Sequence, residues 1–259
     1  MEITHLPKRG FKPREQGITM VMDKGLNQFN AEGLCKMAAP IIDFVKLGFG
    51  TSLFTSDLDE KIEIYHKYGI KVYAGGTLFE AFLVRGMLQE YKDFVKAHNF
   101  DVVEISDGSI VLDHTQKCKL IEEFSAQHTV LSEVGSKVAS VEITPQGWVQ
   151  MMCDELSAGS QYVIAEGREA GNMGIFDSKG AARTDLIDLI TSSVPLDKIL
   201  WEAPTKSQQV WFVKQFGANV NLGNIAADEI ISLETIRCGL RGDTFGLYLP
   251  EDLRSNVQR

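Results

Sequence analysis

Two kinds of segment follow one another along the chain. Short, nearly continuous apolar runs rich in Val and Ile, such as ITMVMD at 18–23 and YVIAEG at 162–167, predict buried parallel β-strands. Longer stretches with apolar residues at helical spacing come between them, for example DLDEKIEIYHKYG at 57–69, which stops at a glycine. The pattern therefore predicts strands and helices in regular alternation.

Eight strand–helix units can be recognised in this way. The predicted strands occupy 18–23, 41–50, 70–76, 101–106, 128–133, 162–167, 198–203 and 219–225. The predicted helices occupy 31–39, 57–69, 77–99, 112–127, 145–159, 184–193, 207–217 and 228–240. Eight such units in about 250 residues are typical of an α/β protein with the (β/α)8 TIM barrel fold. A doubly wound open sheet is the alternative, but it rarely needs eight parallel strands.

Composition agrees with one globular unit. The 259 residues are 44% hydrophobic and 24% charged, and no linker or low-complexity run divides them. We therefore expect residues 1–259 to form a single barrel domain with a short extended N-terminal lead-in. The cysteines show no CxxC spacing and are expected to be free thiols in a reducing cytoplasm; they are Cys35, Cys118, Cys153 and Cys238.

Charge and hydropathy narrow the range of partners. The net charge of −9 argues against binding to nucleic acid. The N-terminus lacks the apolar core of a signal peptide, and no apolar run approaches the roughly 20 residues of a membrane span. We expect a cytoplasmic protein without nucleic-acid or membrane partners, and a homo-oligomer, because large barrels often associate.

Acidic residues recur where the predicted strands end. In such a barrel the carboxyl ends of the strands share one face, which holds the active site. The fourth to seventh strands each bring one glutamate there, namely Glu104, Glu133, Glu166 and Glu202. Like charges at close range require a counter-charge, and Mg²⁺ prefers carboxylate oxygens. The sequence predicts a magnesium site with Glu104, Glu133 and Glu166 as its ligands or as supports for its bound waters.

Basic and amide side chains map to the same face. Any one Glu–Lys neighbour pair suits a structural ion pair equally well, but the recurrence on several strands favours a site. The loops after the seventh and eighth strands, EAPTKSQQ and NLGNIAADE, occupy positions that commonly bind phosphate in barrels. We expect small anions to be bound by Lys24, Lys46, Arg168, Lys206, Asn221, Gly223 and Asn224.

Several blocks of the sequence, taken in order, resemble one known family. They are GITMVMDKGL, DFVKLGFGTS, KVYAGGTLFE, VEISDGSI, SEVGSK, IAEGREAG, WEAPTKSQQV, VNLGNI and ISLETIRCGLRGDTFG, which span residues 17–246. Together they resemble the phosphosulfolactate synthase family. The resemblance implies a TIM-barrel lyase that uses Mg²⁺ to add sulfite to C3 of phosphoenolpyruvate, forming (2R)-phospho-3-sulfolactate. In methanogens this reaction opens coenzyme M biosynthesis.

The resemblance and the chemistry both point to Lys137 as the general acid that protonates C2. Ser136, Ala170 and Thr205 depart from the family pattern, which has Lys, Ser and often Gln at these positions. Two other functions suit the same barrel. One is an aldolase in which Lys137 or Lys206 forms a Schiff base, and the other is a non-catalytic, stress-associated relative. The charged strand ends favour the synthase.

Overall fold

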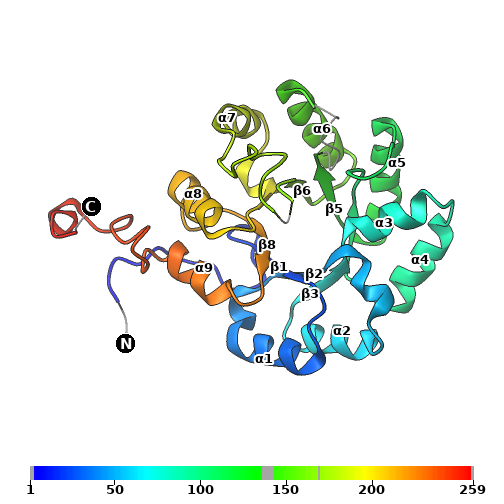
Figure 1. Ribbon diagram of the computed structural model, residues 1–259, viewed down its shortest axis with the longest axis horizontal. Helices are drawn as coiled ribbons and strands as arrows, with labels where there is room; N and C mark the ends of the chain where they lie inside the picture. Colours follow the sequence, from blue (N-terminus) through cyan, green and yellow to red (C-terminus); the bar gives the residue numbers. More distant parts are fainter. Residues whose placement is uncertain (1–2, 136–142, 169, 258–259) are drawn as a thin grey trace.

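The computed structural model describes residues 3–135, 143–168 and 170–257, and its strands form a parallel barrel (Figure 1). The hydrogen-bonded order is β3-β2-β1-β8-β7-β6-β5-β4. The strands are β1 (Thr19–Asp23), β2 (Phe44–Leu47), β3 (Lys71–Ala74), β4 (Val102–Ile105), β5 (Thr129–Val134), β6 (Tyr162–Ala165), β7 (Ile199–Glu202) and β8 (Leu222–Ala226). The (β/α)8 TIM barrel predicted from the sequence is confirmed.

The barrel closes between β3 and β4, the two ends of this order. Asp101, the residue before β4, joins them twice. Its backbone N–H donates to the carbonyl of Val72 in β3 at 3.2 Å, and its carboxylate accepts from the N–H of Val72 at 2.9 Å. Backbone groups that an open edge would leave unpaired are thereby satisfied.

Helices surround the barrel, and a last short helix lies apart from it near the C-terminus (Figure 1). They are α1 (Gln28–Ala38), α2 (Leu58–Lys67), α3 (Gly76–Leu83), α4 (Leu88–Ala97), α5 (His114–Ser125), α6 (Pro145–Ser157), α7 (Thr184–Ser193), α8 (Lys206–Phe216), α9 (Ile230–Arg237) and α10 (Glu251–Arg254), with 3₁₀ segments η1 (Ala39–Ile41), η2 (Gly48–Phe54) and η3 (Leu196–Lys198). The apolar faces of α1 to α9 pack on outward-pointing strand residues. Trp201 of β7, for example, stacks on Phe212 of α8 with ring centroids 5.1 Å apart. None of the described helices has the length and apolarity that crossing a bilayer requires.

Some predicted elements differ in extent from the observed ones, and two differ most. The helix predicted at 77–99 is two helices, α3 and α4, because Gly86 has a φ of +69° that ends the first one. The strand predicted at 41–50 ends at the last residue of β2, and the chain continues as η2. There Phe49 and Gly50 have φ values of +56° and +77°, which no strand can contain.

The side chains inside the barrel form two layers. The lower layer is apolar and fully buried, and it consists of Ile18, Met20, Phe44, Tyr73, Val102, Leu131, Tyr162, Ile164 and Leu200. Two residues beyond the last of these on each strand, the next inward position lies nearer the carboxyl end, because strand side chains repeat every second residue. At that level the barrel carries Met22, Lys46, Gly75, Glu104, Glu133, Glu166 and Glu202. A charged layer therefore lies directly above an apolar floor.

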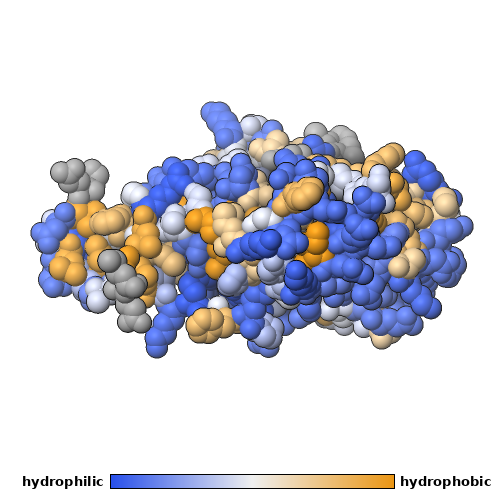
Figure 2. All heavy atoms as spheres, turned by 90° about the horizontal axis from the view of Figure 1, so that it is seen from below, coloured by the Kyte–Doolittle hydropathy of each residue, from blue (hydrophilic) through white to orange (hydrophobic). Residues whose placement is uncertain are grey.

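The two ends of the chain leave the barrel on the same side (Figure 1). Arg9 ties the N-terminal lead-in to α9 through Glu234, with Nε 2.9 Å from Oε1. Figure 2 shows apolar side chains scattered among polar ones and gathered at the end of the molecule that the terminal segments form. Phe11, Phe245 and Leu253 of these segments are exposed.

Candidate active site

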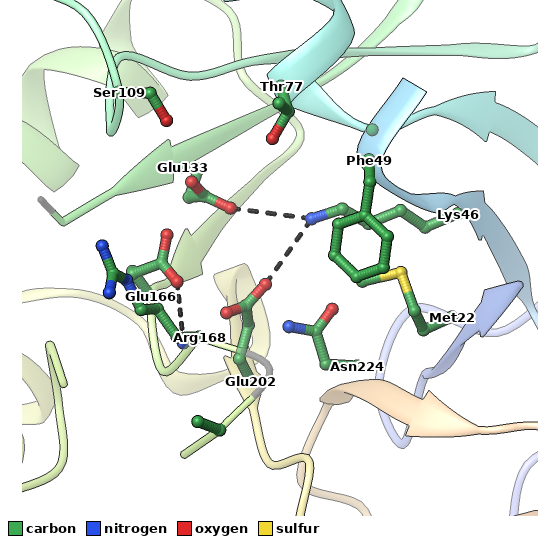
Figure 3. Close-up of a pocket in the computed structure, with 12 residues that line it drawn as sticks. Met22, Lys46, Phe49, Thr77, Ser109, Glu133, Glu166, Arg168, Glu202 and Asn224 are labelled. Atoms are coloured by element: carbon green, nitrogen blue, oxygen red, sulfur yellow. Dashed lines mark hydrogen bonds and ion pairs between the residues drawn. The ribbon is translucent and has the colours of Figure 1, made fainter. Parts of the chain in front are cut away.

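A cavity of about 640 Å³ opens at the carboxyl ends of the strands (Figure 3). Every strand, or the loop that follows it, contributes to its lining. The lining residues are Met22, Lys46, Phe49, Gly75, Thr77, Ser109, Glu133, Glu166, Arg168, Ala170, Glu202 and Asn224. The carboxyl ends of the strands therefore share one cavity, on the face where the sequence predicts the active site.

Lys46 lies at the centre of the charged layer. Its Nζ is 2.9 Å from Oε1 of Glu104, 3.5 Å from Oε1 of Glu202 and 3.6 Å from Oε2 of Glu133. Burial disfavours the charged amine, but the three carboxylates outweigh it and hold the pKa of Lys46 well above the ordinary lysine value. Lys46 is therefore an ammonium at neutral pH, and its positive charge offsets the repulsion among the three glutamates.

Glu104 is bonded to two groups of the protein itself. Besides Lys46, its Oε1 accepts the backbone N–H of Gly76 at the first turn of α3, at 2.7 Å. Burial raises the pKa of this carboxyl, while Lys46 acts in the opposite direction. A Cβ at Gly76 would lie only 2.8 Å from this oxygen. Gly76 thus lets the N-terminus of α3 approach the carboxylate of Glu104.

Three other carboxylates converge. Glu133, Glu166 and Glu202 each offer an oxygen atom, and these atoms lie within 4.8 Å of one another in a buried setting. The structure therefore groups Glu202, rather than the predicted Glu104, with Glu133 and Glu166. Glu104 is directed to Lys46 and the start of α3 instead. Three carboxylate oxygens at this spacing are a donor set that suits a hard cation such as Mg²⁺.

The loop after β6 wraps around these carboxylates. The N–H of Gly167 donates to Oε2 of Glu202 at 3.0 Å, and the N–H of Arg168 donates to Oε1 of Glu166 at 2.7 Å. Arg168 has a φ of +57°, and its side chain lines the cavity as predicted. A Cβ at Gly174 would lie 1.9 Å from the carbonyl oxygen of Glu166, so only glycine permits this tight passage.

A β-bulge turns Asn224 into the cavity. The register shifts along β8, since Thr19 pairs with Leu222 whereas Val21 pairs with Ile225. Asn224 has a φ of +55°, lines the cavity as predicted, and carries a buried Oδ1 that accepts no hydrogen bond from the described residues. Gly223 lies below the cavity, where a Cβ would be 2.7 Å from Cε of Met20. Its role is close packing.

Asn221 was predicted at the wrong end of the barrel. It precedes β8 instead of ending it, so it lies at the amino ends of the strands. Its Oδ1 accepts the N–H of Ile18 at 3.0 Å, and its Nδ2 donates to the carbonyls of Asp197 and Ile199. Asn221 therefore joins three chain segments far from the cavity.

Of the predicted basic residues that the structure describes, Lys206 and Lys24 are not among those that line the cavity. Lys206 begins α8, its side chain is 45% exposed, and its Nζ lies 2.8 Å from Asp243. Lys24 follows β1 and is exposed. Lys137, the predicted general acid, and its neighbour Ser136 lie outside the described residues.

Two buried charged residues that the sequence analysis missed hold the site in place. Glu80 of α3 accepts the N–H groups of Gly108 and Ser109 at 3.1 and 3.0 Å, which places Ser109 against the cavity. Lys117 of α5 is fully buried and donates to the carbonyl oxygen of Glu133 at 2.6 Å. A charged residue on the apolar face of a predicted helix, as in LFEAFL, is the signal that could have revealed Glu80.

Comparison with solved structures agrees with the fold. The YdjI aldolase from Escherichia coli K12 superposes with a TM-score of 0.55 over 94% of this chain and 86% of that chain, at 11% sequence identity. At this identity the likeness shows the barrel fold alone.

Comparison of sequences shows the family. Residues 7–243 match the family described as (2R)-phospho-3-sulfolactate synthase (ComA). The phosphosulfolactate synthase of Methanothermobacter thermautotrophicus is 42% identical over 93% of this chain and 95% of its own length. That of Methanocaldococcus jannaschii is 43% identical over 90% of this chain and 95% of its own length. The chain belongs to the (2R)-phospho-3-sulfolactate synthase family.

Proposed function

We propose that this protein is a Mg²⁺-dependent phosphosulfolactate synthase that adds sulfite to C3 of phosphoenolpyruvate. One observation carries the proposal: the carboxylates of Glu133, Glu166 and Glu202 converge within 4.8 Å of one another in the cavity at the carboxyl ends of the strands. Family membership supplies the substrates to test, because the relatives are named for this product.

The charges around the cavity support a divalent cation. Among the described residues that line the cavity, Glu133, Glu166 and Glu202 are acidic, and Lys46 and Arg168 are basic. A divalent cation would favour the ionised forms of three carboxylates held this close together. Glu133, Glu166 and Glu202 would hold the ion, and the amide oxygen of Asn224 lines the same cavity. Bound Mg²⁺ would supply a Lewis acid near the substrate carboxylate, where negative charge develops as C3 is attacked.

The proposed reaction forms one bond, between sulfur and C3, and adds one proton, at C2. The lone pair on the sulfur of sulfite forms the bond to C3, and the π electrons of C2=C3 move to C2 and the carboxylate. Sulfite needs no base at neutral pH. C2 then takes a proton, and we propose that the ammonium of Lys137 donates it. Lys137 comes two residues after Gly135, which directly follows β5 and is buried there. Arg168 would hold an anionic group of the substrate.

The Schiff-base alternative requires a lysine that loses its proton readily. Lys46 does not meet this requirement, because its three carboxylates hold its pKa above the ordinary value. Lys206 is paired with Asp243 outside the cavity. Of the lysines proposed for that chemistry, Lys137 is therefore the candidate to test.

Phosphorus NMR of the purified protein with phosphoenolpyruvate, sulfite and Mg²⁺ tests the proposal. We expect a new phosphate-ester resonance that depends on both sulfite and Mg²⁺. A covalent adduct after borohydride treatment would favour the aldolase instead. A folded protein that binds phosphoenolpyruvate but produces no new resonance would favour the non-catalytic relative.

A further inference from the structure

Two apolar side chains line one part of the cavity. Met22, from the end of β1, and Phe49, from the segment after β2, line it together. Figure 3 shows both side chains on the side away from Glu166 and Arg168. We call Met22 and Phe49 the apolar wall. The proposed reaction assigns no role to either residue, so their placement beside a charged layer requires its own explanation.

The backbone holds Phe49 in an unfavourable conformation. Its φ of +56° and ψ of 19° are left-handed, a conformation that is unfavourable for a residue with a side chain. Core packing does not account for this, since Phe49 is 52% exposed. Among described non-glycine residues with positive φ, Phe49, Arg168 and Asn224 all line this one cavity. Such conformations persist where the fold imposes them, and they cluster at functional sites.

A missing side chain makes room for Met22. A Cβ at Gly48 would lie 2.6 Å from Sδ of Met22, so a residue other than glycine would displace the thioether. Met22 also occupies the level of the barrel at which Lys46 and the glutamates point inward. β1 thus places an apolar group where four other strands, or the residue after them, place a glutamate.

We infer that the apolar wall receives the C3 methylene of an enol phosphate and so selects a three-carbon over a two-carbon phosphorylated acid. The inference rests on the proposed function. Phosphoenolpyruvate has a carboxylate and a phosphate, which gain from charged partners, and one apolar end, the methylene group. Only the methylene gains from contact with a thioether and an aromatic ring. Contact there would leave the carboxylate directed to the charged side of the cavity.

Equilibrium binding of two inert analogues tests the inference. Phospholactate carries a methyl group at the C3 position, and phosphoglycolate lacks that carbon; neither has a double bond that sulfite could attack. By calorimetry with Mg²⁺ present, we expect the wild-type protein to bind one enantiomer of phospholactate about tenfold more tightly than phosphoglycolate, as one methyl group in an apolar pocket allows. Phe49→Ala should reduce this ratio to about twofold or less, while the Kd for phosphoglycolate changes by less than about threefold.

Matched variants distinguish an effect of the apolar wall on the affinity ratio from a general loss of folded structure. Phe54→Ala removes a 90% exposed phenylalanine from the same segment, outside the cavity lining, and should keep the wild-type ratio. Phe49→Leu should retain most of the ratio, because an apolar side chain remains. Gly48→Ala should lower it by displacing Met22 while Phe49 is intact. Circular dichroism and the Tm of each variant establish that it is folded.

The outcomes distinguish this inference from the function on which it rests. If both analogues bind and the ratio is unchanged in Phe49→Ala and Gly48→Ala, the wall has no part in selection and the inference is overturned alone. If neither analogue binds to the wild-type protein, the proposed substrate class is wrong, and the inference falls with it.

Discussion

Lys46 reaches across β3 to Glu104 of β4, and its Nζ lies 2.9 Å from Oε1 of that glutamate. The path is open because Gly75, the residue after β3, has no side chain. A Cβ there would lie 3.0 Å from Cε of Lys46. The ion pair between Lys46 and Glu104 therefore depends on the absence of a side chain at Gly75.

Removing the charge of Lys46 should destabilise the fold. Lys46→Met leaves buried carboxylates without their counter-charge, and we expect a loss of about 3–5 kcal/mol in the free energy of unfolding, measured with urea at neutral pH. Glu104→Gln in the same chain should recover part of this loss. The exposed Lys36, 3.2 Å from Glu32, is the control, and Lys36→Met should cost less than about 1 kcal/mol. Additive effects of the two changes at Lys46 and Glu104 would show that they do not interact.

The stabilisation from Lys46 should disappear at high pH. Its pKa is raised by folding above the ordinary lysine value of 10.5, so the folded state keeps this proton longer than the unfolded chain. Stability due to Lys46 is then fully present below about pH 10.5 and falls as the pH rises towards the folded-state pKa. The difference in unfolding free energy between wild type and Lys46→Met should be constant from pH 8 to about 10.5 and should decrease above it. A difference that grows with pH would contradict the assignment.

Mg²⁺ binding should depend on Glu202 more than on Glu104. Glu202 belongs to the group of three converging carboxylates, whereas Glu104 is bonded to Lys46 and Gly76. Calorimetric titration should show Glu202→Gln weakening Mg²⁺ affinity by at least about tenfold, and Glu104→Gln by no more than about threefold. A larger loss of Mg²⁺ affinity in Glu104→Gln than in Glu202→Gln would support Glu104 as a ligand, as predicted from the sequence.

Two asparagines three positions apart should behave differently. Asn221→Ala leaves buried backbone groups of Ile18 and Ile199 unsatisfied, so we expect a loss of about 1–3 kcal/mol in stability with KM for phosphoenolpyruvate unchanged. Asn224→Gly keeps the left-handed backbone and removes an amide from the cavity, so KM should rise while the Tm changes little. If Asn221→Ala raised KM and Asn224→Gly lowered stability instead, the placement of both residues would be refuted.

Lys137 should affect the chemical step. If its ammonium protonates C2, Lys137→Ala should lower kcat by about 10²–10⁴. The Kd of phosphoenolpyruvate, measured without sulfite, should stay within about threefold of wild type, because the proposed role concerns proton transfer after attack. An unchanged kcat would remove Lys137 from this role.

Local patterns were sufficient to predict the barrel. A strand pattern of consecutive Val and Ile and a helical pattern of spaced apolar residues can each be recognised from neighbouring residues alone. Eight strand patterns, each followed by a helical one, are compatible with few other folds. The predicted strand ends likewise placed Glu104, Glu133, Glu166 and Glu202 on one face of the barrel. The predicted strand at 219–225 began three residues too early, and Asn221 was assigned to the wrong end of it.

What the sequence determined by itself is the barrel and the face on which its charges gather, since both follow from spacing along the chain. Only the tertiary structure decided that Lys46 binds Glu104 across a glycine, that Glu202 joins Glu133 and Glu166, and that a bulge turns Asn224 inward. These contacts join residues on different strands, and their distances depend on the register and tilt of the closed sheet. No local pattern contains that information.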